Sequence, residues 1–153
     1  MERLHPRVRW LWLGRVAVAA VVFGAVVGAA VRFGLGRSPW PGLAVGLAIL
    51  VVGTVHAVHR FRVFRYEVQD DALYIERGVL TTVTTVVPYV RVQHVDTQRD
   101  PIERLAGLSR VVVYTAGSRG ADVAIPGLLP DRARDLQERL RTLANESEPD
   151  DAV

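Results

Sequence analysis

Two long apolar runs, Trp10–Val31 and Trp40–Val58, dominate the first sixty positions of the chain. The first carries no charge after Arg15, and the second contains only two polar side chains, Thr54 and His56, after its first turn. At about 1.5 Å per helical residue, each run is about long enough to cross a hydrocarbon core roughly 30 Å thick. The pattern predicts a transmembrane hairpin, with helices over 10–32 and 40–59 joined by a short external loop over 33–39.

Residues typical of the membrane interface lie at the ends of both runs. Indole rings favour the headgroup region, and an arginine near a helix end can extend its guanidinium to the headgroups. Basic residues just after the second run would be attracted to anionic lipid. The predicted interface residues are Trp10, Trp12, Arg15, Trp40, Arg60, Arg62 and Arg65.

Each run also contains two glycines spaced four residues apart, Gly24 and Gly28 in the first and Gly42 and Gly46 in the second. This GxxxG spacing lets helix backbones approach closely. It favours packing of the two helices against each other, and the alternative is a contact between two copies of the chain.

Arginines are more frequent outside the hairpin than in its loop. Three lie within residues 1–9, Arg15 follows, and three more come after the second run, whereas the loop region contains Arg32 and Arg37. The positive-inside rule therefore predicts a cell-membrane protein with both termini in the cytoplasm. Residues 1–9 also resemble the start of a signal peptide, but the long first run and the second run soon after it favour an uncleaved anchor.

From Phe64 the pattern changes to short stretches that alternate apolar and polar residues or are rich in Val and Thr. Turns are expected at Asp70-Asp71, after Gly78 and over 117–120. The predicted strands are Phe64–Gln69, a stretch through Leu73 and Ile75, Leu80–Val87, Tyr89–Val95, Arg110–Thr115 and Ala121–Ile125.

Two helices are expected in this second part. Asp100, Pro101 and Glu103 form a capping-box pattern that predicts a short helix over Pro101–Ala106, and Gly107 suits a left-handed C-cap. A second helix over Pro130–Ala144 has one apolar stripe, and the acidic residues after it predict a disordered tail over 146–153. The stripe consists of Ala133, Leu136, Leu140 and Leu143.

The order of several short motifs resembles a known family. These are Arg77-Gly78, Pro88, the segment Arg91–Val95, Leu105–Leu108 and finally Tyr114–Gly117. They resemble the YdbS-like PH-domain membrane proteins of bacteria and archaea, in which two transmembrane helices precede one bacterial PH domain. The resemblance implies a transmembrane hairpin followed by a mainly-β PH-like barrel or sheet over 60–145, capped by the C-terminal helix. It also implies a membrane-protein partner, such as a larger relative with several PH domains.

Charge and composition exclude several function classes. Residues 1–66 contain nine Arg and one acid, whereas residues 67–153 contain ten Arg and fifteen acids, a net charge of −5. An acidic domain would repel nucleic-acid phosphates, so no nucleic-acid partner is expected. Cysteine and lysine are both absent, which excludes thiolate and Schiff-base chemistry. No cofactor is expected, and the pair His56 and His59 lacks a further ligand for a metal.

Arg91, Gln93 and His94 are the most prominent polar group in the predicted sheet. On a strand, Arg91 and Gln93 would share one face and His94 would lie on the other. They could form a binding patch for a partner or an anionic headgroup. Alternatively, Arg91 pairs with a nearby acid and Gln93 satisfies an edge backbone group. Asp70 and Asp71 at the first turn disfavour phosphoinositide binding.

The sequence contains no G-x-S-x-G elbow and no glycine-rich phosphate loop, and its carboxylates are explained as caps and turns, so an enzyme is not expected. The prediction is a non-enzymatic scaffold or interaction module at the cytoplasmic face of the membrane. The alternative is a module that binds a lipid or another small ligand in the cell envelope. A small transport or envelope-stress component is a third class, and it would require the chain to form a homo-oligomer.

Overall fold

The computed structural model describes residues 2–116 and 122–147, and these form two compact units. One unit is the helical hairpin, Arg9–Arg62. The other combines the first eight residues with everything from Val63 onward.

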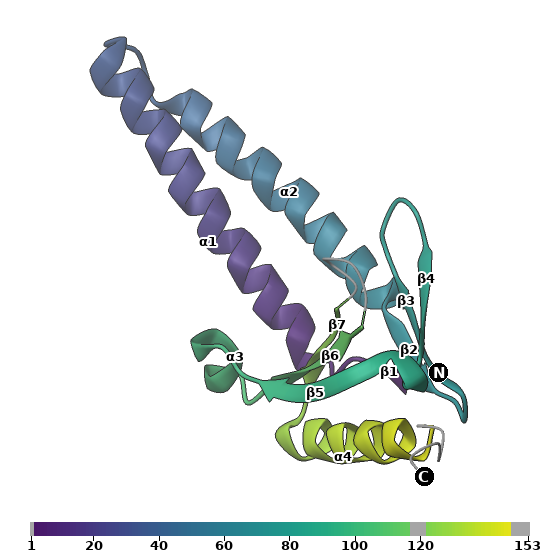
Figure 1. Cartoon of the computed structure of the whole chain (residues 1–153). Helices are drawn as coiled ribbons and strands as arrows, with labels where there is room; N and C mark the ends of the chain where they lie inside the picture. Colours follow the sequence, from purple (N-terminus) through teal and green to yellow (C-terminus); the bar gives the residue numbers. More distant parts are fainter. Residues whose placement is uncertain (1, 117–121, 148–153) are drawn as a thin grey trace. The chain divides into compact units, whose positions relative to one another are not determined.

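The hairpin unit contains two long apolar helices joined through a single π-helical turn. α1 spans Arg7–Ala29, η1 spans Ala30–Gly34 and α2 spans Trp40–Val63 (Figure 1). Each is long and apolar enough to cross a membrane, and the most apolar 18-residue stretch has a mean hydropathy of 2.2 in the α1–η1 segment and 2.0 in α2. α2 continues beyond the predicted residue 59, so Arg60 and Arg62 lie in its last turn.

The second unit contains two antiparallel sheets. Their strands are not hydrogen-bonded to each other within the described residues, so the sheets do not close into a barrel. The four-stranded sheet has the order β1-β2-β3-β4 and the three-stranded sheet the order β5-β6-β7. The strands are β1 (Glu2–Arg3), β2 (Arg65–Val68), β3 (Ala72–Arg77), β4 (Val83–Pro88), β5 (Val92–Gln98), β6 (Ser109–Thr115) and β7 (Val123–Leu128).

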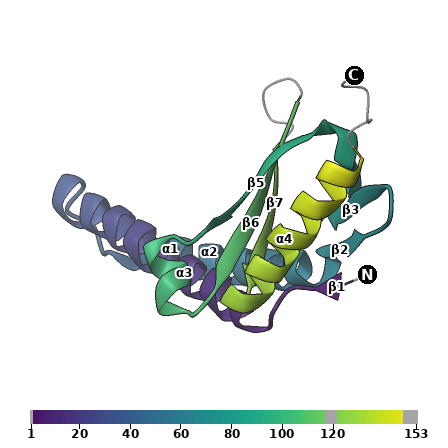
Figure 2. The ribbon, with the colours of Figure 1, turned by 60° about the horizontal axis from the view of Figure 1, so that its bottom comes forward.

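Alternating side chains from both sheets form the core of this unit. Leu73 and Ile75 of β3 and Val111 and Val113 of β6 are completely buried. The helix α4 (Pro130–Glu146) contacts β5 and β6 and lies across the three-stranded sheet in Figure 2. Its stripe is confirmed, because three of its four residues are buried. These are Ala133, Leu136 and Leu140.

The short helix α3 (Pro101–Leu105) confirms the predicted capping box. The Glu103 amide donates to Asp100 Oδ1 at 2.7 Å, and the Asp100 amide donates to Glu103 Oε2 at 3.1 Å. Arg110 of β6 bonds both carboxylates, at 2.6 Å to Asp100 and 3.1 Å to Glu103. Gly107 follows with φ of +66°, which is the left-handed C-cap conformation that glycine adopts without strain.

The first residues of the chain belong to the sheet unit, which the sequence pattern did not indicate. β1 pairs with β2 through Glu2 opposite Tyr66. The His5 amide then donates to the Gly127 carbonyl at 3.0 Å, and Val8 is buried. Gly127 has φ of +67°, and a Cβ added there would lie 2.6 Å from the Cβ of Val8. The chain therefore contributes to this unit on both sides of the hairpin.

Several predicted boundaries are wrong. β4 begins at Val83 rather than Leu80, because residues 78–82 form the turn from β3. Tyr89–Val95 is not a continuous strand, since Tyr89–Arg91 forms the 3₁₀ turn η2 before β5 begins. β7 extends to Leu128, beyond the predicted Ile125.

The C-terminal helix also extends further than predicted, since α4 includes Asn145 and Glu146. The rest of the proposed tail, residues 148–153, lies outside the described residues. So do the predicted turn at 117–120 and the first residue of the strand predicted over Ala121–Ile125.

Candidate functional site

A polar groove of about 380 Å³ lies between the η2–β5 segment and the last turns of α4. We call it the β5–α4 groove. Backbone or apolar atoms of Tyr89, Val90 and Val92 line it alongside side chains that can form hydrogen bonds. The polar lining residues are Gln93, His94, Asp96, Gln137, Arg141 and Asn145.

A β-bulge places Gln93 at the mouth of the groove. Val92 pairs with Thr115 and His94 with Tyr114, so Gln93 is the extra residue without an opposite partner on β6. Bulges interrupt pairing and redirect side chains, and they occur often beside functional sites. Gln93 is exposed, and its amide group is available to a bound molecule.

His94 is held by its neighbours on the sheet. Its ring stacks on the ring of Tyr114, the cross-strand partner, with centroids 4.2 Å apart and planes inclined by 17°. Its Nε2 lies 3.9 Å from Asp96 Oδ2, and both side chains are half exposed. The stacked ring is thus a lining residue of the groove with one nitrogen near a carboxylate.

The helix side of the groove combines one fixed and one free polar side chain. Gln137 donates from Nε2 to the Val95 carbonyl at 2.7 Å and accepts at Oε1 from Thr97 at 2.9 Å, so it fastens α4 to β5. Arg141 lies one turn further along α4 and is exposed. Within the described part of the chain its guanidinium has no hydrogen bond or ion pair, and all five of its N–H donors remain open.

Tyr89 forms the inner wall of the groove and has a structural role. It is 1% exposed, and its hydroxyl donates to the Gln69 carbonyl at 2.7 Å. Burial raises the pKa of Tyr89 to about 12, with smaller effects from the nearby charges of Arg139, Asp71 and Asp70. The phenol therefore stays protonated at physiological pH, so it does not act as a general base.

The predicted binding patch is only partly assembled. Gln93 and His94 both line the β5–α4 groove, but Arg91 does not. The expectation that Arg91 and Gln93 share one strand face is wrong, because Arg91 belongs to η2 and Gln93 to the bulge. The backbone of Arg91 nonetheless connects η2 to the residue that follows β6, because its carbonyl accepts a hydrogen bond from the Ala116 amide at 2.8 Å.

Sequence reasoning missed the contribution of α4 to this groove. Gln137, Arg141 and Asn145 are spaced by four residues, so they form one polar row beside the buried apolar stripe. That spacing is visible in the sequence. What the sequence could not indicate is which strand the row would face.

The predicted interface residues lie in both units. Trp10 and Trp40 are largely exposed on α1 and α2. The guanidinium of Arg60 lies 4.6 Å from the ring centroid of Trp12, a cation–π contact that joins the two helices near their ends. Arg15 and Arg62 are exposed in their helices, and Arg65 lies in β2 opposite Glu76.

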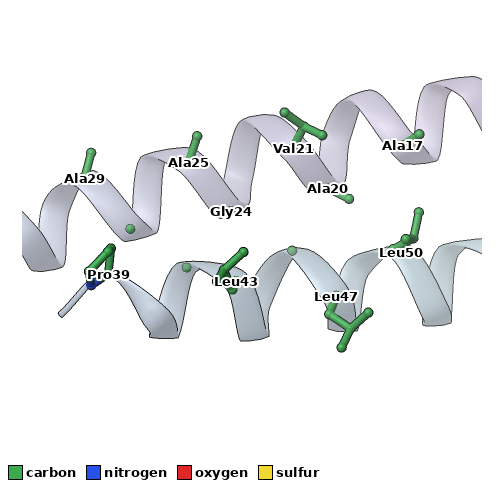
Figure 3. Close-up of a pocket in the computed structure, with 13 residues that line it drawn as sticks. Ala17, Ala20, Val21, Gly24, Ala25, Ala29, Pro39, Leu43, Leu47 and Leu50 are labelled. Carbon is green, nitrogen blue, oxygen red and sulfur yellow. The ribbon is translucent and has the colours of Figure 1, made fainter.

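The four glycines of the two GxxxG pairs lie where the two helices approach each other. A Cβ added at Gly42 would overlap the Gly24 carbonyl and lie 2.5 Å from the Gly28 nitrogen. One added at Gly46 would lie 3.0 Å from the Ala20 carbonyl. Beside them runs an apolar groove of about 680 Å³, lined by Ala25, Leu43 and Leu47 among others (Figure 3). The spacing thus serves packing within the hairpin.

No group of three or more His, Cys, Asp or Glu residues is arranged to hold a metal ion among the described residues. His56 and His59 both lie on α2. The groove residues therefore offer hydrogen bonding and charge recognition.

Comparisons with known proteins agree with this architecture. The family model described as Bacterial PH domain matches residues 10–144. The chain is 32% identical over 114 residues to the UPF0699 transmembrane protein YdbS of Bacillus subtilis (strain 168), covering 70% of this chain and 72% of that protein. No solved structure matches the chain significantly. With two apolar helices preceding the sheets and the closing helix, the chain belongs to the YdbS-like membrane proteins of the bacterial PH-domain family.

Proposed function

We propose that this membrane-anchored PH-like protein is a non-enzymatic interaction module that binds another membrane protein through the β5–α4 groove. The observation that carries the proposal is the combination, within one groove, of an amide on the bulged Gln93 and a guanidinium on Arg141 that has no hydrogen bond or ion pair among the described residues. A guanidinium and an amide together recognise a carboxylate or a backbone carbonyl in fixed geometry. A polar segment of a partner protein offers both carboxylates and backbone carbonyls.

The rest of the groove suits recognition better than catalysis. Gln137 is already committed to the Val95 carbonyl and to Thr97, and Tyr89 is held neutral by burial. His94 and Asp96 are solvent-accessible at 3.9 Å, and the described residues that line the groove include no Ser, Thr or Cys that His94 could activate. The matched family is defined by a PH domain rather than by a reaction.

The placement of the N-terminal segment supports a cytoplasmic location of both ends. The pairing of β1 with β2 supports a topology in which residues 2–8 and the sheet unit lie in the same compartment. A chain that leaves and re-enters one compartment crosses the membrane an even number of times. The excess of arginines around the start of α1 and the end of α2, compared with the loop between the two helices, favours the cytoplasm as that compartment.

The experiment is affinity purification of the tagged full chain in mild detergent, with analysis of both co-purified proteins and lipids. The double variant Gln93→Ala/Arg141→Ala should lose a stoichiometric membrane-protein partner. The matched control is Arg134→Ala, which removes an exposed arginine from the same helix outside the groove and should retain it.

A second candidate function is recognition of an anionic lipid headgroup by the same arginine. Arg141 is the observation that favours it, since a guanidinium without a partner among the described residues also binds phosphate. Co-purification of a tightly held lipid without a protein, lost in the double variant, would replace the interaction module by this function. Retention of the partner by the double variant would contradict the proposed contact surface.

A further inference from the structure

The turn between β3 and β4 presents an apolar side chain to solvent. Leu80 is 98% exposed, and Val83 at the start of β4 is 47% exposed. Gly78 holds this turn with φ of +122°, and a Cβ added there would overlap the Thr81 carbonyl. We call residues 79–82, at the apex of the β-hairpin formed by β3 and β4, the hairpin tip. Because its backbone is constrained, the exposure of Leu80 is a property of the fold.

Charge is distributed unusually around the hairpin tip. No acidic residue occurs between Arg77 and Val95, although residues 67–153 carry a net charge of −5. The charged residue next to the tip is Arg77, which is exposed at the end of β3. An apolar tip flanked by a cation is complementary to a membrane surface that contains anionic lipid.

The register of the sheet places the tip beside the point where the chain arrives from the second membrane helix. β2 begins at Arg65, two residues after α2 ends at Val63. Arg65 is opposite Glu76, and Glu76 is opposite Thr84. The tip therefore lies at the same end of the four-stranded sheet as the start of β2. At about 3.3 Å per residue, its apex reaches on the order of 10 Å beyond that cross-strand row.

We propose that the hairpin tip inserts Leu80 into the headgroup layer of the membrane that α1 and α2 span. The occupant of this surface is lipid, because the tip is apolar, flanked by Arg77 and joined to a membrane helix by only a few residues. The threonine hydroxyls of Thr81 and Thr82 remain at headgroup level, where they can form hydrogen bonds. This attachment is independent of the β5–α4 groove and would restrict the sheet unit to one orientation at the bilayer.

Single-cysteine labelling tests the proposal directly, because the chain contains no native cysteine. Leu80→Cys carries an environment-sensitive fluorophore in the full chain, reconstituted at one chain per nanodisc of phosphatidylcholine and phosphatidylglycerol. The matched control is Asp70→Cys, at an exposed residue in the turn between β2 and β3, at the opposite end of these strands from the tip and outside the β5–α4 groove. Both positions are exposed, so neither change should unfold the domain.

Insertion predicts a blue-shifted emission at position 80 and quenching by lipids spin-labelled near the headgroup that is several-fold stronger than at position 70. Arg77→Glu in the Leu80→Cys background should reduce that quenching. Equal quenching at the two positions would overturn the proposal. A blue shift that also occurs in detergent and disappears on dilution would overturn it in favour of contact between two copies of the chain.

Discussion

The hydroxyl of Tyr66 donates a 2.7 Å hydrogen bond to Oε2 of Glu2, a residue 64 positions earlier in the chain. The other carboxylate oxygen of Glu2 accepts from Arg132 Nη2 at 2.6 Å. One carboxylate thus joins β1, β2 and α4. The segments that precede α1 and follow α2 thereby belong to the same folded unit.

Removing the Glu2 carboxylate should release the N-terminal strand while leaving the rest of the sheet folded. Glu2→Gln replaces an exposed charge-assisted pair, so the loss of global stability should be within about 1 kcal/mol. The local effect should be larger, because β1 has only two residues. Hydrogen exchange of the peptide containing His5, whose amide bonds Gly127, should become faster than in the native chain.

The same attachment should weaken in acid. Burial alone would raise the pKa of Glu2, but hydrogen bonds from Tyr66 and Arg132, with the charges of Arg132 and Arg139, together lower that pKa below 4.5. A depressed pKa means that the carboxylate stabilises the fold above about pH 4.5 and loses this contribution as the pH falls through its folded value. Exchange at His5 should accelerate in that range for the native chain, and less so for Glu2→Gln after correction for intrinsic exchange.

Close packing of the hairpin predicts that a side chain at Gly42 is disruptive. Gly42→Leu would force the two helices apart, because the added Cβ would already overlap backbone atoms of the facing helix. We expect a lower unfolding temperature in detergent. Gly14→Leu is the control, since nothing lies within 4 Å of a Cβ at that position. Equal effects of the two substitutions would show that the hairpin does not depend on this contact.

Local signals in the sequence were sufficient for much of the fold. The capping box at Asp100 and Glu103 and the stripe of α4 were predictable because they depend on residues within one or two turns. The attachment of β1 was not predictable, because Glu2 and Tyr66 are distant in sequence and a two-residue strand has no periodicity. The bulge at Gln93 is equally invisible, since pairing register is a property of two strands.

The closing helix should contribute strongly to stability through Leu140. This side chain is completely buried in the sheet unit. Leu140→Ala should cost about 2–5 kcal/mol, from lost burial and the cavity left behind. Leu105→Ala, at a leucine that is 90% exposed in α3, should cost far less. Denaturant titration of both variants in the same detergent would measure the difference, and similar midpoints would contradict the assignment of α4 to the core.

The buried carboxylate of Glu103 gives a last prediction, because its role extends beyond the cap. Glu103 is 6% exposed and accepts both the Asp100 amide and the Arg110 guanidinium. Glu103→Gln keeps an acceptor for the cap but removes the charge facing Arg110, and Glu103→Ala removes both. Losing a helix cap costs about 1 kcal/mol, and leaving buried polar groups unsatisfied adds about 1–3 kcal/mol. We therefore expect the alanine variant to be the less stable of the two in denaturant titration. If both lost the same stability, the charge on Glu103 would matter and its capping bond would not.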